Sequence, residues 1–152
     1  MSNDRMKFRA YHKKYRKMYD VLHLHLDSCE GIWATCRGFD VIEQKDIHIQ
    51  IQPKDCIIIQ CTGLKDKTGK LLFEGDIVKC YTWYCDDEPE LNEFTINPIV
   101  WGSSNSYPAF DIREHEYECN GLQYFVEEVE ANTCIEIIGN IHENPELLGE
   151  TL

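Results

Sequence analysis

Long apolar runs are missing from this 152-residue sequence. Its apolar runs are only a few residues long, such as Ile57 to Ile59, and about 20 residues are needed to cross a bilayer. The first ten residues are polar and basic, without the apolar stretch of a secretory signal. We therefore expect no membrane segment and a cytoplasmic location.

Catalytic and metal-binding signatures are missing as well. The sequence has no nucleophile motif, no phosphate-cradling glycine loop, no helical histidine pair and no Cys-x-x-Cys. Its eight cysteines are Cys29, Cys36, Cys56, Cys61, Cys80, Cys85, Cys119 and Cys134. Because cytosolic thiols stay reduced, we expect free thiols that pack as small apolar residues, rather than disulfides or zinc ligands. The sequence predicts no enzyme, no cofactor and no metal site.

Two polar groups are candidates for a site, and each also has a structural interpretation. His23 and His25 share one face of an expected strand and could hold a metal, but between leucines they suit the polar face of an alternating strand. A hydrolytic cluster could be formed by Asp111, Glu114, His115 and Glu116. Because they lie in one short polar segment, we interpret these residues as a solvent-exposed (wet) loop or an edge strand.

Basic residues are scarce in the second half of the chain. The 15 Lys and Arg face 27 Asp and Glu, for a net charge of −12. Residues 1–20 carry a net charge of +5, whereas residues 86–152 carry −15, with Arg113 as their one basic residue. Such an acidic surface repels phosphate, which disfavours nucleic acid and favours a basic protein as partner. The basic N-terminal strands could also lie against the acidic C-terminal part, within one fold or between subunits.

Alternating side chains predict a mainly β fold. Strands are expected over residues 8–10, 18–26, 31–36, 47–51, 55–62, 77–83, 98–102, 110–112 and 134–139. A turn is expected over 64–70, and residues 86–97 are typical of a loop or an excursion from the core. Cys56 and Cys61 lie an odd number of residues apart in one strand, which places them on opposite faces.

One helix interrupts this pattern. Leu122, Phe125, Val126 and Val129 follow the i, i+3, i+4, i+7 spacing of an amphipathic helix, and Asn144 can cap a short terminal helix. With 43% hydrophobic residues, the chain has enough apolar surface for one domain over residues 1–152. We expect a small β-barrel or rolled antiparallel sheet, with the amphipathic helix packed near the C-terminus.

Two segments carry a family resemblance. Residues 61–78, CTGLKDKTGKLLFEGDIV, and residues 137–148, IIGNIHENPELL, resemble the YopX family of phage and prophage proteins. The opening residues 7–11 and 17–20 and the segment 100–102 also fit, although Cys61 and His142 stand where this family often has tyrosine. The resemblance implies a mainly β protein from a bacteriophage or integrated element of a bacterial host, in a family with no established activity.

The glycines of these segments have a structural interpretation. Gly63, Gly69, Gly75 and Gly139 suit chain reversals or close backbone approach, and the neighbouring aspartates suit turns. The pairs Thr62-Gly63 and Gly75-Asp76 could instead frame a ligand pocket. We interpret the protein as a non-catalytic binding module for a basic host or phage protein. The alternatives are a self-assembling structural protein, which makes a homo-oligomer possible, or a nucleic-acid-binding protein that uses the basic N-terminal hairpin.

Overall fold

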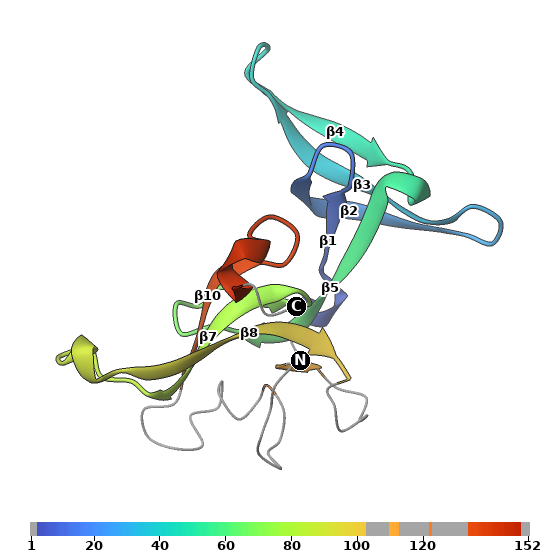
Figure 1. Ribbon diagram of the computed structural model, residues 1–152. Helices are drawn as coiled ribbons and strands as arrows, with labels where there is room; N and C mark the ends of the chain where they lie inside the picture. The colour runs from blue at the N-terminus through green and yellow to red at the C-terminus, as the bar shows by residue number, and fades with distance from the viewer. Residues whose placement is uncertain (1–2, 103–109, 113–121, 123–133, 150–152) are drawn as a thin grey trace.

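The computed structural model describes residues 3–102, 110–112, 122 and 134–149, which form two antiparallel sheets (Figure 1). The first sheet has the order β4-β3-β2-β1-β5-β6. Its strands are β1 (Phe8–His12), β2 (Lys17–Asp27), β3 (Gly31–Asp40), β4 (Lys45–Ile51), β5 (Cys56–Lys65) and β6 (Leu71–Phe73). The second sheet, in the order β10-β7-β8-β9, contains β7 (Asp76–Trp83), β8 (Glu93–Trp101), β9 (Phe110–Ile112) and β10 (Cys134–Asn140). The mainly β prediction is therefore confirmed.

Short 3-10 helices complete the described chain. They are η1 (Asn3–Met6), η2 (Pro53–Asp55), η3 (Pro89–Leu91) and η4 (Pro145–Leu148). The predicted amphipathic helix lies outside the described residues, apart from Leu122, which is buried in the core of the second sheet. Within the described chain, no helix has the length and apolar character that a membrane span requires.

The apolar side chains are divided among three clusters. One joins the second sheet to β6 of the first and contains Leu72, Val78, Cys80, Ile99, Ile112, Leu122 and Ile135. The other two lie in the first sheet, around Ala10, Ala34, Cys36, Ile51 and Cys56, and around Tyr11, Ile59, Cys61 and Phe73. The prediction that Cys56 and Cys61 point to opposite faces is confirmed, because each belongs to a different cluster. Strand β5 is thus covered on both sides.

The predicted closure into a barrel is wrong. Both sheets are open, with β4 and β6 at the edges of one and β10 and β9 at the edges of the other. A barrel requires the two edge strands of one sheet to pair. Here the six-stranded sheet ends instead in a three-residue strand, β6, after which Gly75, with φ of +79°, turns the chain into the second sheet.

The expected loop at residues 86–97 is only partly a loop. Strand β8 begins at Glu93, earlier than predicted, and Glu93 to Asn97 pair with β7 in a long hairpin. Figure 1 shows this hairpin, in yellow-green, extending away from the rest of the molecule. The first four residues of β8, Glu93 to Ile96, are exposed, so they do not need the apolar alternation from which a half-buried strand is recognised.

Candidate functional site

The two family-like segments meet in space where the sheets join. The Gly75 amide donates to the Ile99 carbonyl, and the Gly75 carbonyl accepts from the Ile141 amide, both at 2.8 Å. Gly139 lies so close to the terminal turn that an added Cβ would be 2.7 Å from Leu147 Cδ1. The expected positive φ is confirmed at Gly75, and the expected close approach is confirmed at Gly139. Both glycines lie at the junction.

Asp66 fixes the turn of the first segment against the second. Its Oδ1 accepts from the Thr68 amide at 2.9 Å, the Thr68 hydroxyl at 2.7 Å and the Lys70 amide at 2.9 Å. Its Oδ2 accepts from the Ile137 amide of β10 at 3.2 Å. Burial alone would raise the pKa of Asp66, but these hydrogen bonds outweigh it and lower the pKa. The predicted turn-capping role of Asp66 is confirmed.

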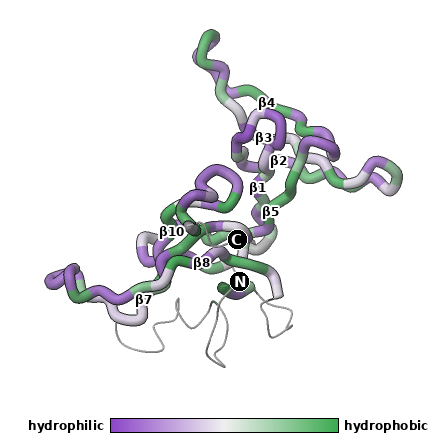
Figure 2. Tube along the Cα trace, viewed as in Figure 1, coloured by the Kyte–Doolittle hydropathy of each residue, from purple (hydrophilic) through white to green (hydrophobic). Residues whose placement is uncertain are grey.

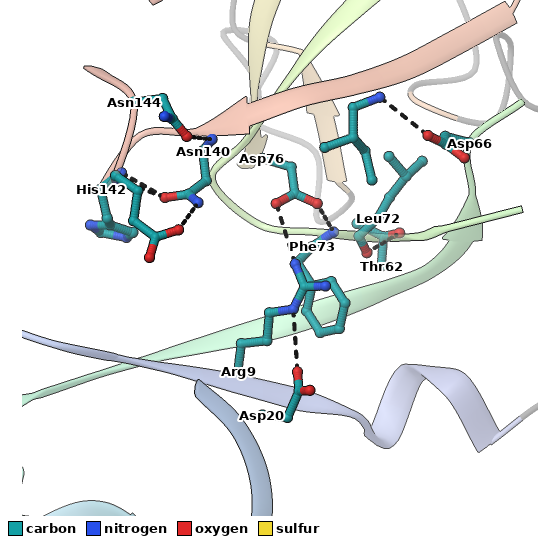
Figure 3. Close-up of polar contacts among 12 residues, drawn as sticks. Arg9, Asp20, Thr62, Asp66, Leu72, Phe73, Asp76, Asn140, His142 and Asn144 are labelled. Carbon is teal, nitrogen blue, oxygen red and sulfur yellow. Dashed lines mark hydrogen bonds and ion pairs between the residues drawn. The ribbon is translucent and has the colours of Figure 1, made fainter. Parts of the chain in front are cut away.

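Asp76 carries a buried charge between the sheets. It is 3% exposed, and its Oδ2 accepts from the Phe73 amide at 2.8 Å. Arg9 of β1 extends toward it, with Nη1 3.7 Å from Asp76 Oδ1, while Arg9 Nε lies 3.7 Å from Asp20 (Figure 3). Burial raises the pKa of Asp76 to about 6, although the Phe73 hydrogen bond and Arg9 oppose this change.

The N-terminal hairpin also contacts the C-terminal segment directly. The rings of Tyr11 and His142 stack with centroids 4.6 Å apart, and the Met18 amide donates to Glu143 Oε1 at 3.0 Å. The basic hairpin and the acidic end therefore touch within one chain. The terminal turn begins at Pro145 as expected, but the predicted side-chain cap is wrong, because Asn144 Oδ1 accepts from the Asn140 amide instead.

His23 and His25 contact neighbouring side chains and do not converge on a common metal position. The rings of His23 and His25 are 6.5 Å apart. His25 stacks on Trp33 at 3.7 Å, and its Nε2 lies 3.0 Å from Thr35 Oγ1. Among the residues that the structure describes, no group of three or more His, Cys, Asp or Glu side chains could hold a metal ion.

The other predicted polar groups take structural positions. Asp111 lies on the edge strand β9 as expected, but it is 1% exposed and therefore not wet. Residues 114–116 of the proposed hydrolytic cluster lie outside the described chain. The Thr62 hydroxyl donates to the Leu72 carbonyl at 2.9 Å and accepts from the Leu64 amide at 3.1 Å, which ties β5 to β6.

The cysteines within the described chain are free thiols, as expected. Cys36, Cys56, Cys61 and Cys80 are buried, whereas Cys29 is exposed. Burial raises the pKa of Cys36 to about 11 and that of Cys80 to about 12. Such thiols are poor nucleophiles and behave as apolar packing groups.

The end of the β7–β8 hairpin combines negative charge with exposed apolar side chains. We call residues 83–96 the arm. Residues 86–93 hold five carboxylates, which belong to Asp86, Asp87, Glu88, Glu90 and Glu93, and all five residues are exposed. Between and beside them are four large apolar side chains, Trp83 (47% exposed), Leu91 (53%), Phe94 (43%) and Ile96 (40%). Figure 2 shows hydrophilic and hydrophobic residues interspersed along this hairpin.

A groove with the opposite charge lies on the first sheet. It has a volume of about 1070 Å³ and is bordered by η1, β1, β2, the 65–71 turn and Ile137. Five cations line it, namely Lys7, Arg9, Arg37, Lys65 and Lys70, against two carboxylates, Asp4 and Asp20. Its apolar lining includes Phe8, Val21, Leu22, Leu71, Phe73 and Ile137.

Sequence reasoning identified residues 86–97 as an acidic excursion from the core, but it missed the exposed apolar side chains of the arm, and it missed the groove altogether. The arm could have been found, because large apolar residues recur among the acids of 83–96 and are too few to form a core there. The groove had no such signal. Its lining runs from Asp4 to Ile137, and of its five cations only Lys7 and Arg9 belong to the segment recognised as basic.

Comparison with known proteins agrees with the fold. The crystal structure of protein EF1440 from Enterococcus faecalis is similar, with a TM-score of 0.61 and 21% identity over 93% of this chain and 96% of that chain. A search of curated proteins found no match. The family model described as YopX protein matches residues 7–149, so this chain belongs to the YopX family.

Proposed function

We propose that this protein is a non-catalytic binding module of a phage or prophage that docks on a basic protein through the arm. The observation that carries the proposal is the composition of the arm, where five exposed carboxylates surround four exposed large apolar side chains. The phage or prophage setting follows from the family resemblance of the segments 61–78 and 137–148.

The two kinds of side chain have separate roles in docking. Clustered apolar groups on a surface mark interaction sites, because covering them removes apolar area from water. Phe94 and Ile96 are two residues apart on β8 and therefore share one face of the hairpin. The carboxylates add a negative field that steers a basic partner and rejects acidic ones.

The non-catalytic part of the proposal is supported by what the buried polar groups do. Asp66 and Asp76 accept hydrogen bonds from backbone amides at the junction, and Thr62 links two strands. Asp76 has a raised pKa, yet the side chain that faces it is Arg9 rather than a histidine. This arrangement suits a charge that joins two sheets better than a general acid.

The test immobilises the purified protein and measures which host proteins it captures from a lysate at low and at high salt. We expect a basic protein to bind at low salt and to be released at high salt, where exposed charges are screened. A triple variant of the arm, Asp87→Asn, Glu88→Gln and Glu90→Gln, should lose this capture. The matched control neutralises three exposed acids elsewhere, Glu30→Gln, Asp46→Asn and Glu146→Gln, and should retain it.

The proposal is overturned if capture is the same for the arm variant and for the wild type, or if no salt-sensitive partner is recovered. Leu91→Ser tests the apolar contribution separately. Because Leu91 is 53% exposed, this change should weaken capture without lowering the stability of the fold.

A further inference from the structure

Three cations of the groove form no ion pair with a carboxylate of the described residues. Lys7 pairs with Asp4 at 2.8 Å, and Arg9 lies 3.7 Å from Asp20. In contrast, Arg37, Lys65 and Lys70 make no ion pair with any residue that the structure describes. Within the part of the chain that the structure describes, the groove thus carries three unpaired positive charges, on a chain whose net charge is −12.

The arm has the complementary properties. Its five acidic side chains form no ion pair with the described residues. Its exposed apolar side chains match an apolar groove lining that includes Phe8, Leu71 and Phe73. Charge of opposite sign and apolar surface on both sides are what a specific protein interface requires.

We propose that the groove receives the acidic arm of a second copy of this chain. The inference rests on the proposed function, because it uses the arm as the docking element and names one partner for it. In the structure the arm extends away from the first sheet (Figure 1), and no described ion pair joins it to the groove of its own chain. Docking therefore takes place between copies.

A protein arm suits this groove better than nucleic acid does. Both ligands are negatively charged, so repulsion by the acidic chain does not distinguish them. The arm also offers exposed apolar side chains to the apolar lining of the groove, which a phosphate backbone does not.

The geometry has a consequence for assembly. The arm and the groove are different surfaces, so one arm–groove contact leaves one free arm and one free groove on the bound pair. These two can meet each other and close a two-fold dimer by reciprocal exchange of arms, or each can bind a further copy and extend the assembly into a ring or a filament.

Sedimentation velocity of the purified full chain tests the inference. At low salt the wild type should associate into dimers or larger species as its concentration rises, and these should dissociate at high salt. The groove variant Lys65→Glu with Lys70→Glu should be monomeric under the same conditions. The control variant Lys14→Glu with Lys54→Glu makes the same change of charge outside the groove and should assemble like the wild type.

A mixing experiment gives the sharpest result. The arm variant, Asp87→Asn, Glu88→Gln and Glu90→Gln, has an intact groove, and the groove variant has an intact arm. Each should be monomeric alone, but an equal mixture should form a one-to-one dimer that grows no further. A monomeric wild type, a mixture that stays monomeric, or assembly by the groove variant alone overturns the inference.

The remaining outcomes separate this inference from the proposed function. If the groove variant loses binding to a single-stranded oligonucleotide while the wild type stays monomeric, the groove holds nucleic acid and the inference is wrong. If self-association fails but arm-dependent capture of another basic protein persists, the proposed function stands without this inference. If the arm variant behaves as the wild type in both assays, both are wrong.

Discussion

Replacing Asp76 with asparagine should change how the stability of the protein depends on pH. Asp76 is 3% exposed, and burial raises its pKa from the usual 3.8 to about 6. The folded state therefore holds this proton more tightly than the unfolded state does. Stability from this group is fully present below pH 3.8 and is lost as the pH rises through about 6. Asparagine has no charge to lose, and its side-chain oxygen can still accept from the Phe73 amide.

The magnitude follows from the same change in pKa. Each pH unit between the unfolded and the folded pKa is worth about 1.4 kcal/mol, so the interval from 3.8 to about 6 corresponds to about 3 kcal/mol. The free energy of unfolding of the wild type, relative to that of Asp76→Asn, should fall by about this amount between pH 4 and pH 7. Groups common to both proteins, such as His142, cancel in this difference.

Urea unfolding monitored by tryptophan fluorescence and by circular dichroism, at several pH values, measures the quantity. The second variant, Arg9→Gln, removes the guanidinium 3.7 Å from Asp76 Oδ1. Because Arg9 favours the carboxylate, its removal should raise the pKa of Asp76 further and extend the loss of stability to higher pH.

The reasoning is refuted if the difference between wild type and Asp76→Asn is flat from pH 4 to pH 7, or if it grows with pH. A growing difference would mean that Arg9 outweighs burial and that the ion pair stabilises the fold.

Three further predictions concern the junction and the thiols. Asp66→Ala removes a carboxylate that accepts from three backbone amides and one hydroxyl. It should lower the free energy of unfolding by about 3 kcal/mol in urea titrations. A loss near zero would show that water replaces the carboxylate as acceptor. Gly139→Ala places a methyl group within 3 Å of three side-chain atoms, and should lower the melting temperature through an overpacking penalty of about 1–3 kcal/mol; unchanged melting would contradict the close approach. In a thiol titration of the native protein, Cys29 should react quickly and Cys80 only after unfolding, and fast reaction of Cys80 would disprove its burial.

The sequence by itself determined most of the strands and the main turns, but not β6 or the start of β8. A period of two along the chain decides which side chains can share a face, and this is a local property. The hairpin of β1 and β2, the opposite faces of Cys56 and Cys61, and the turn at Asp66 were therefore predictable. The family was also recognisable, because the motifs at 61–78 and 137–148 stand in the right order.

Only the tertiary structure decided how these pieces meet. Whether a sheet closes depends on pairing between edge strands, which no local pattern encodes, and the sheets proved open. The raised pKa of Asp76 arises from burial between β1 and β7, and its residue type gave no sign of this. The groove likewise depends on folding, because it gathers five cations spread from Lys7 to Lys70 onto one surface of an acidic chain. Charge counted along a sequence gives the total, whereas binding depends on where the fold places each charge.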